Sequence, residues 1–190
     1  NNEALLVAAY VISSEVLLCM TEGNIAHEIA KYEVIYFLIL GMLYSGTSKN
    51  SLIYTLFILL LIPGIYIGAN VLGHDVNVRK AILFNILGEV TLFVSAIYCY
   101  QRRVNMLQLE YIIKALALPL VSILTYLFLY TPSIKDVVTG TQSNFETSGG
   151  FGPNQVSTIL GLGMFCFFIL LVLFSKIRKL QLIHAAVLIL

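Results

Sequence analysis

Long apolar runs separated by short polar links are the feature that most limits what this chain can fold into. The runs cover residues 4–20, 32–44, 51–71, 81–100, 107–130 and 154–175, and a further run begins at 182. Several reach the roughly 20 residues that a helix needs to cross a bilayer. Open strands would leave backbone polar groups unbonded in lipid, so the pattern predicts transmembrane α-helices. The run at 32–44 is short, and we expect its helix to be extended by its flanks, tilted, or packed against protein.

The composition points the same way. Hydrophobic residues make up 59% of the chain and charged residues 11%, whereas soluble domains carry about 25% charged residues. The absence of a basic stripe interleaved with aromatic residues argues against nucleic acid as a partner. We expect residues 1–190 to form a single all-α transmembrane domain of about six spans plus the start of a seventh. Because the chain begins with Asn and stops inside an apolar run, we also expect it to be a fragment of a longer multi-span protein.

The cysteines and histidines argue against a metal centre. Cys19, Cys99 and Cys166 each lie inside an apolar run, no CxxC spacing occurs, and the three histidines are scattered. Lone buried thiols pack as small hydrophobic side chains. We therefore expect neither a metal nor a cofactor.

Lysine and arginine residues in the links predict the orientation of the chain. One alternate set of links (46–50, 101–106 and 176–181) carries six of these cations, and the other set (21–31, 73–80 and 131–153) carries four. The richer set is predicted to face the cytoplasm. The longest link, 131–153, then faces outward, where long ordered loops often carry function.

Charged residues lie well inside three of the apolar runs. Glu15 and Glu89 lie deep within the first and fourth runs, and each is either a functional carboxyl or a protonated or paired group that holds helices together. Asn85 shares a helix face with Glu89 because the two are four residues apart. Lys114 follows Glu110 by four residues, which predicts a helical ion pair near the cytoplasmic surface.

The stretch 147–157 is the one place where glycine, proline and polar residues crowd directly before a long apolar run. Gly149, Gly150 and Gly152 permit backbone conformations closed to other residues. Gly152 followed by Pro153 is typical of a helix N-cap and first helical position. The N–H groups and dipole of such a helix, with the Asn154 and Gln155 amides, favour a phosphate or a sugar. A capped helix start with a packing groove explains the same residues, and both interpretations stay open on physical grounds.

The segment Thr147-Ser-Gly-Gly-Phe-Gly-Pro-Asn-Gln-Val-Ser-Thr-Ile-Leu-Gly-Leu-Gly163 resembles the motif of the O-antigen ligase and O-antigen polymerase-like bacterial membrane proteins. In that family a glycine and an aromatic residue precede a Pro-Asn pair at the outer start of a helix. The segment Tyr10-Val-Ile-Ser-Ser-Glu15 is similar to the family's early helices, as is Arg79 leading into Phe84-Asn-Ile-Leu-Gly88.

The resemblance implies an all-helical glycosyltransferase of the bacterial inner membrane. Such enzymes move a glycan from an undecaprenyl diphosphate carrier to a lipid A core, a growing glycan or a protein hydroxyl on the periplasmic side, without a nucleotide sugar or a metal. The substrate-binding residues that it implies are Gly150, Gly152, Asn154, Gln155, Arg79 and Lys80. The catalytic residues stay unknown, with Glu89 and Glu146 as weaker candidates for the base. The family's main periplasmic loop would follow further along the chain.

Two other functions fit the sequence. A transporter or channel subunit would use Glu15, Glu89 and glycine-broken helices to pass an ion or a small anion. A structural membrane subunit would carry no chemistry. In every case membrane lipids are expected partners.

Overall fold

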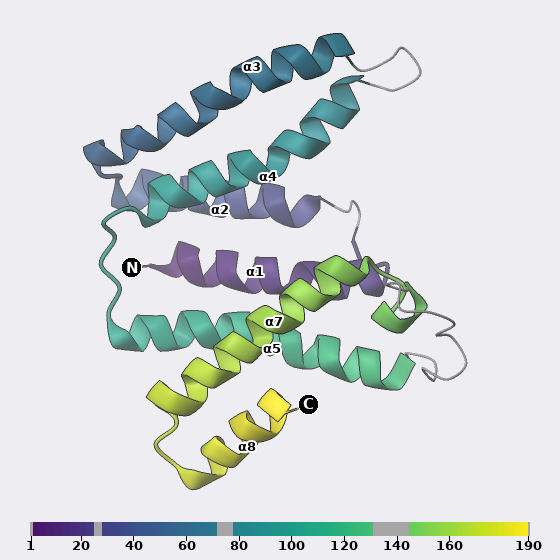
Figure 1. The fold of residues 1–190 in the computed structure, drawn as a ribbon. Coiled ribbons are helices and arrows are strands. Elements are labelled where there is room, and N and C mark those ends of the chain that lie inside the picture. Colours follow the sequence, from purple (N-terminus) through teal and green to yellow (C-terminus); the bar gives the residue numbers. More distant parts are fainter. Residues whose placement is uncertain (1, 25–27, 72–77, 131–144, 190) are drawn as a thin grey trace. The chain divides into compact units, whose positions relative to one another are not determined.

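The computed structural model describes residues 2–24, 28–71, 78–130 and 145–189, and every regular element in them is helical (Figure 1). The long helices are α1 (Glu3–Met20), α2 (Ile29–Ser45), α3 (Thr55–Val71), α4 (Val78–Cys99), α5 (Met106–Tyr130), α7 (Pro153–Ile169) and α8 (Arg178–Ile189). Shorter helical turns are η1 (Lys49–Tyr54), η2 (Glu146–Ser148) and η3 (Leu170–Phe174), the last of which is π-helical.

Five stretches are long and apolar enough to cross a membrane: Glu3–Met20, Lys49–Val71, Ile82–Cys99, Met106–Tyr130 and Glu146–Phe174. The predicted all-α, polytopic membrane fold is thereby confirmed. The helix from the short run at 32–44 is extended by its flanks to the 17 residues of α2. At 1.5 Å per residue α2 is about 25 Å long, which is short of the roughly 30 Å hydrocarbon core. It is therefore the predicted span that this set leaves out.

The chain divides into two compact units. The first contains the N-terminal residues to Ala4 and Lys31–Val104, and thus α2, η1, α3 and α4. The second contains Leu5–Ala30 and Asn105–Leu190, and thus nearly all of α1 with α5, α7 and α8. Each unit is described by itself below.

In the first unit, Arg102 joins the C-terminal ends of α2 and α4. Its guanidinium donates to Ser45 Oγ at 2.8 Å, to the Gly46 carbonyl at 3.1 Å, and through Nε to the Tyr98 carbonyl at 2.9 Å. It also stacks 3.7 Å above the centroid of the Tyr98 ring. Ser48 Oγ lies 3.1 Å from Gln101 Oε1. The links after α2 and after α4 therefore lie at one end of the unit, as alternating spans require.

In the second unit, α7 packs on α5 and α8 (Figure 1). One buried cluster joins α1, α5 and α7 and consists of Val16, Met20, Leu120, Ile123, Val156 and Ile159. A second joins α5 and α7 and consists of Ile113, Ala117, Cys166, Phe167 and Leu170, with Val187 and Leu188 of α8 packed against it. Gly163 faces α5, where a Cβ would come within 3.3 Å of Leu120 Cδ1. The apolar periodicity of the spans is thus used for helix packing as well as for contact with lipid.

A proline shapes the contact between α1 and α5. Pro119 is buried inside α5, and because proline has no N–H, the Ala115 carbonyl four residues earlier lacks its usual helical donor. Ser13 of α1 is fully buried. Its Oγ lies 3.5 Å from the Ala115 oxygen and 3.0 Å from the Ala9 oxygen of its own helix. Serine side chains of neighbouring helices commonly satisfy carbonyls that prolines free inside a membrane.

Candidate functional site

Residues 145–152, here called the motif turn, form a compact reversal directly before α7. Gly149 and Gly150 both adopt left-handed conformations, with φ of +69° and +75°. The Gly150 N–H donates to the Phe145 carbonyl at 2.9 Å. Ser148 is buried, and its Oγ lies 3.0 Å from the Phe145 oxygen and 2.8 Å from the Phe151 oxygen. Of the three glycines named from the sequence, Gly149 and Gly150 use the left-handed region, whereas Gly152 has a φ of −56° that other residues also adopt.

The motif turn rests on the ends of α1 and α5. A Cβ on Gly149 would lie 3.1 Å from Met20 Cε and 3.3 Å from both Tyr126 Cε1 and Leu127 Cδ2. Tyr126 in turn donates from its hydroxyl to the Met20 carbonyl at 3.2 Å. The sequence pattern did not place Met20 and Tyr126 beside the motif turn. The available signal was the pair of tyrosines, Tyr126 and Tyr130, near the end of an apolar run, where aromatic residues gather at a membrane surface.

Helix α7 begins as predicted, with Gly152 at the N-cap and Pro153 at the first helical position. The Val156 N–H bonds the Gly152 carbonyl at 3.1 Å, and no side chain of the described residues caps the helix by a hydrogen bond. Gln155 folds back so that its Oε1 occupies the space beside Gly152, where a Cβ would collide with it. The third helical position of a capping box places a glutamine in this way. The N-terminal backbone N–H groups of Asn154 and Gln155 precede the first intrahelical bond.

In α7, a stripe of small and polar residues recurs at helical spacing, and its hydroxyls bond the helix itself; it consists of Asn154, Ser157, Thr158 and Gly161. Ser157 Oγ and Thr158 Oγ1 donate to the Asn154 carbonyl at 3.0 and 2.7 Å. Gly161 has no heavy atom within 4 Å of a built Cβ among the described residues. The Asn154 side chain itself is exposed. Asn154 is therefore the member of the stripe that is placed to meet a ligand.

The other predicted site residues are spread over both units. Gly150, Gly152, Asn154 and Gln155 come together at the motif turn, and Glu146 lies exposed in η2 of the same turn. Arg79 and Lys80 belong to the first turn of α4 in the first unit, and their side chains lie outside the described residues. Glu89 is also in α4, and its Oε2 is buried without a hydrogen-bond partner among the described residues. Glu15 lies in α1 of the second unit.

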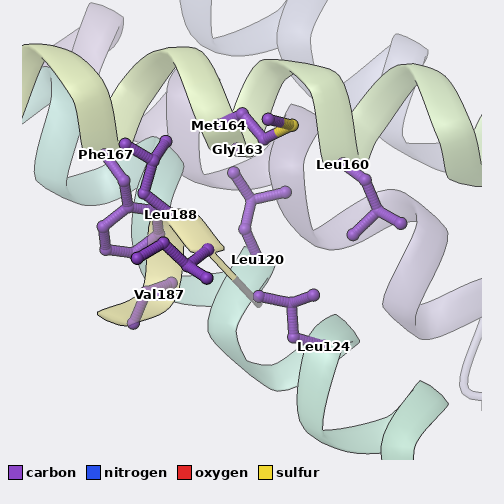
Figure 2. A pocket seen from close by; sticks show the side chains of 9 residues that line it. Leu120, Leu124, Leu160, Gly163, Met164, Phe167, Val187 and Leu188 are labelled. Atoms are coloured by element: carbon purple, nitrogen blue, oxygen red, sulfur yellow. The ribbon is translucent and has the colours of Figure 1, made fainter. Parts of the chain in front are cut away.

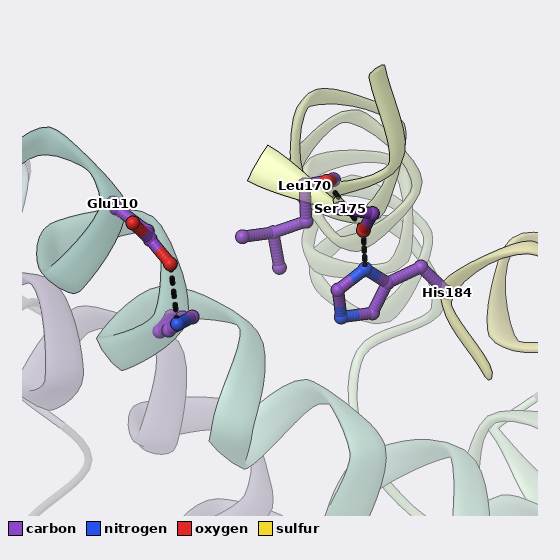
Figure 3. Close-up of polar contacts among 5 residues, drawn as sticks. Glu110, Leu170, Ser175 and His184 are labelled. Atoms are coloured by element: carbon purple, nitrogen blue, oxygen red, sulfur yellow. Dashed lines mark hydrogen bonds and ion pairs between the residues drawn. The ribbon is translucent and has the colours of Figure 1, made fainter. Parts of the chain in front are cut away.

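The predicted ion pair is confirmed at the other end of the second unit. Lys114 Nζ lies 2.6 Å from Glu110 Oε1 (Figure 3). Within the described residues, no group of three His, Cys, Asp or Glu side chains is arranged to hold a metal ion.

Near this ion pair is a hydrogen-bonded pair that the sequence did not suggest. Ser175 Oγ donates to the Leu170 carbonyl at 2.8 Å and lies 2.6 Å from His184 Nδ1 (Figure 3). The single hydroxyl proton of Ser175 is donated to the Leu170 carbonyl. His184 must therefore carry a proton on Nδ1 and donate it to Ser175 Oγ. Burial first, and the charge of Lys114 second, lower the pKa of His184 below its ordinary 6.5. The pair therefore holds a neutral imidazole and fixes α8 to the end of α7.

An apolar cavity of about 220 Å³ lies between α5, α7 and α8 (Figure 2). Its walls include Leu120, Leu124, Leu160, Gly163, Met164 and Phe167, with the last residues of α8. Ligand sites usually add a few convergent polar groups that fix orientation, and these side chains supply none. The cavity is suited to hydrocarbon and does not extend the motif turn.

The fold is that of a multi-pass, all-α membrane protein. In the motif turn, two left-handed glycines lead into the N-terminus of one membrane-spanning helix, α7. Comparisons of the chain with protein-family models, with curated proteins and with solved structures found no match.

Proposed function

We propose that this protein is an O-antigen ligase or polymerase-like glycosyltransferase of the bacterial inner membrane. It would transfer or polymerise a glycan from an undecaprenyl diphosphate carrier on the periplasmic side. The observation that carries the proposal is the motif turn, in which two left-handed glycines lead into the uncapped N-terminus of the membrane-spanning helix α7. The N–H groups in the first turn of α7, together with the helix dipole, attract anions such as a diphosphate.

Catalysis of this reaction requires stabilisation of the leaving group and a base for the acceptor hydroxyl. As the acceptor hydroxyl attacks the anomeric carbon, the bond from that carbon to the diphosphate oxygen breaks, and negative charge grows on the leaving group. The backbone N–H groups of Asn154 and Gln155 would stabilise that charge. A carboxylate would take the proton of the acceptor hydroxyl. Glu146 is the candidate within the motif turn.

Two tyrosines support a sugar ligand beside the motif turn. Tyr126 and Tyr130 stand one helical turn apart at the end of α5, with ring centroids 4.9 Å apart. Tyr126 lies against Gly149, and Tyr130 is largely exposed. A ring at this position offers an apolar face with a polar tip at the membrane surface, and we expect Tyr130 to contact the glycan.

Glycan transfer by the purified full-length protein tests the proposal. A lipid-diphosphate glycan with a fluorescent label is supplied together with a metal chelator, and kcat/KM is measured for the wild type and for Asn154→Ala. The exposed side-chain amide of Asn154 would add a hydrogen bond to the diphosphate, and hydrogen bonds to charged groups contribute about 1.5–3 kcal/mol. Asn154→Ala keeps the backbone N–H but loses this amide, so we expect it to lower kcat/KM by about 10- to 100-fold. Ser157→Ala is the matched control, because its hydroxyl bonds its own helix. Full activity in Asn154→Ala would refute the assignment.

A transporter or channel subunit is the second candidate, and Glu89 is the observation that favours it. A buried carboxyl oxygen without a partner among the described residues is costly in a membrane helix and is a common feature of ion and proton pathways. Glu89→Gln would abolish ion flux into proteoliposomes if this function were correct. The glycosyltransferase predicts no flux in either protein.

A further inference from the structure

We infer that the groove between the end of α7 and α8 binds one anionic phospholipid. The phosphate would lie at Arg178, and an acyl chain would follow Leu171, Leu182 and Ala185. This site is at the opposite end of α7 from the motif turn, and it does not depend on the proposed glycan transfer.

The groove is built by a fixed corner of the backbone. Helix α7 ends in the π-helical turn η3, and Ser175 then turns the chain with an extended ψ of 96°. Ser175 Oγ holds the Leu170 carbonyl at 2.8 Å and lies against His184, while Gln181 Nε2 donates to the Ser175 carbonyl at 3.0 Å. These contacts set the start of α8 beside η3. They leave a groove of about 470 Å³ lined by Leu171, Arg178, Gln181, Leu182 and Ala185.

The lining of the groove changes along its length from polar to apolar. Arg178 and Gln181 belong to the first turn of α8, and Leu182 and Ala185 follow on the same helix face at the i+4 and i+7 positions from Arg178. The step from Arg178 to Ala185 covers about 10 Å at 1.5 Å per residue. A phospholipid has this order of chemistry, because a charged phosphate is followed by hydrocarbon.

Among the described residues, no carboxylate forms an ion pair with the cations at this corner. Lys176, Arg178 and Lys179 are all exposed. Glu110 of α5 is already paired with Lys114 at 2.6 Å. Cations clustered next to a membrane helix attract anionic lipids at about 1 kcal/mol per Lys or Arg. The corner therefore favours an anionic headgroup over a zwitterionic one.

The apolar half of the groove argues for a lipid over a free phosphate. Leu182 is 72% exposed, and Ala185 lines the groove one turn further along α8. An inorganic phosphate would leave these side chains and the floor at Leu171 uncovered, whereas an acyl chain covers them. The occupant thus needs both parts of a phospholipid.

Binding of lipid to the purified full-length protein tests the inference. The protein is held in a neutral detergent, and phosphatidylglycerol or phosphatidylcholine with matched chains is added. Native mass spectrometry counts the bound lipids, and a thermal melt reports stabilisation. We expect one tightly held phosphatidylglycerol, which raises the melting temperature, and much weaker retention of phosphatidylcholine. Arg178→Gln and Lys179→Gln should each weaken phosphatidylglycerol binding about fivefold.

Two variants separate the headgroup from the chain. Ala185→Trp fills the apolar end of the groove while it keeps every cation, and it should also reduce retention of phosphatidylglycerol. Arg103→Gln removes an exposed cation from the first unit, and it is the matched control that should leave retention unchanged. Melts without lipid show whether each variant is folded.

Three results would overturn the inference. Equal binding of the two lipids would remove the role of charge. Unchanged binding by both Arg178→Gln and Ala185→Trp would place the lipid elsewhere. Complete displacement of phosphatidylglycerol by millimolar inorganic phosphate would show that the corner is a phosphate site without a lipid-chain subsite.

Discussion

Ser13 Oγ of α1 lies 3.5 Å from the Ala115 oxygen of α5, which is the carbonyl that Pro119 deprives of a helical N–H. The hydroxyl has nearer acceptors in its own helix, at 3.0 Å on Ala9 and 3.1 Å on Tyr10. The contact with Ala115 is thus a shared and long hydrogen bond. It joins α1 to α5 at the Ala115 carbonyl, which would otherwise lack a hydrogen-bond donor from its own helix.

This relationship predicts coupling between Ser13 and Pro119. We expect Ser13→Ala to lower the free energy of unfolding by about 0.5–1.5 kcal/mol, in the range found for hydrogen bonds between membrane helices. In a Pro119→Ala background the restored N–H bonds Ala115, so the same serine substitution should cost less. Ser14→Ala is the control, since Ser14 bonds the Val11 carbonyl of its own helix. Denaturation in mixed micelles measures the free energy of unfolding of the wild type, the two single variants and the double variant. An equal loss from Ser13→Ala in the two backgrounds would contradict the coupling.

Arg102 should be the most sensitive cation of the first unit. Its guanidinium bonds two helix ends and stacks on Tyr98, so we expect Arg102→Ala to cost about 2–3 kcal/mol in the free energy of unfolding. Arg102→Lys should recover only part of this loss, because an ammonium cannot reproduce the planar fork. The neighbouring Arg103 is exposed, and Arg103→Ala should stay within about 0.5 kcal/mol of the wild type. A similar cost at both positions would refute the role of Arg102.

The two left-handed glycines should differ in their tolerance of alanine. The left-handed conformation costs an ordinary residue about 1–2 kcal/mol, and that is the whole penalty expected for Gly150→Ala, where a Cβ meets open space among the described residues. Gly149→Ala adds crowding against Met20, Tyr126 and Leu127. It should therefore lower the melting temperature further than Gly150→Ala. The opposite order would mean that the motif turn does not rest on α1 and α5.

The Ser175–His184 contact predicts an acid-sensitive α7–α8 corner. Burial and Lys114 lower the pKa of His184 in the folded protein below 6.5, so the unfolded chain binds the proton more readily. Stability is fully present above pH 6.5 and falls as the pH drops from there towards the folded-state pKa. We expect the melting temperature of the wild type to decrease more between pH 7.5 and 5 than that of His184→Gln. Parallel pH profiles for the two proteins would contradict this prediction.

Local patterns in the sequence were enough for several features. Helix positions followed from the apolar runs, the start of α7 followed from Gly152 and Pro153, and the Glu110–Lys114 pair followed from a spacing of four residues. Each of these depends on residues close in the chain, where helix geometry alone fixes the neighbours.

The contacts that the sequence did not predict join distant segments. Ser13 meets Ala115, and Tyr126 meets Met20, about a hundred residues away in each case. Their partners are backbone carbonyls, which every residue carries and no pattern marks. The polarity of α7 is likewise a poor guide to a ligand site, because Ser157 and Thr158 donate to their own backbone and so offer a ligand less than their side chains suggest.

Helix α3 has no buried residue, although it carries Pro63 in its interior. The side chains of this helix are almost all apolar, and the rest of the protein leaves most of their surface exposed. Helix α3 contacts α4 and η1, but most of its surface faces the surrounding medium. Bilayer thickness and detergent chain length therefore act on this helix as core side chains act on others. The same polypeptide would hold α3 firmly in one lipid and loosely in another.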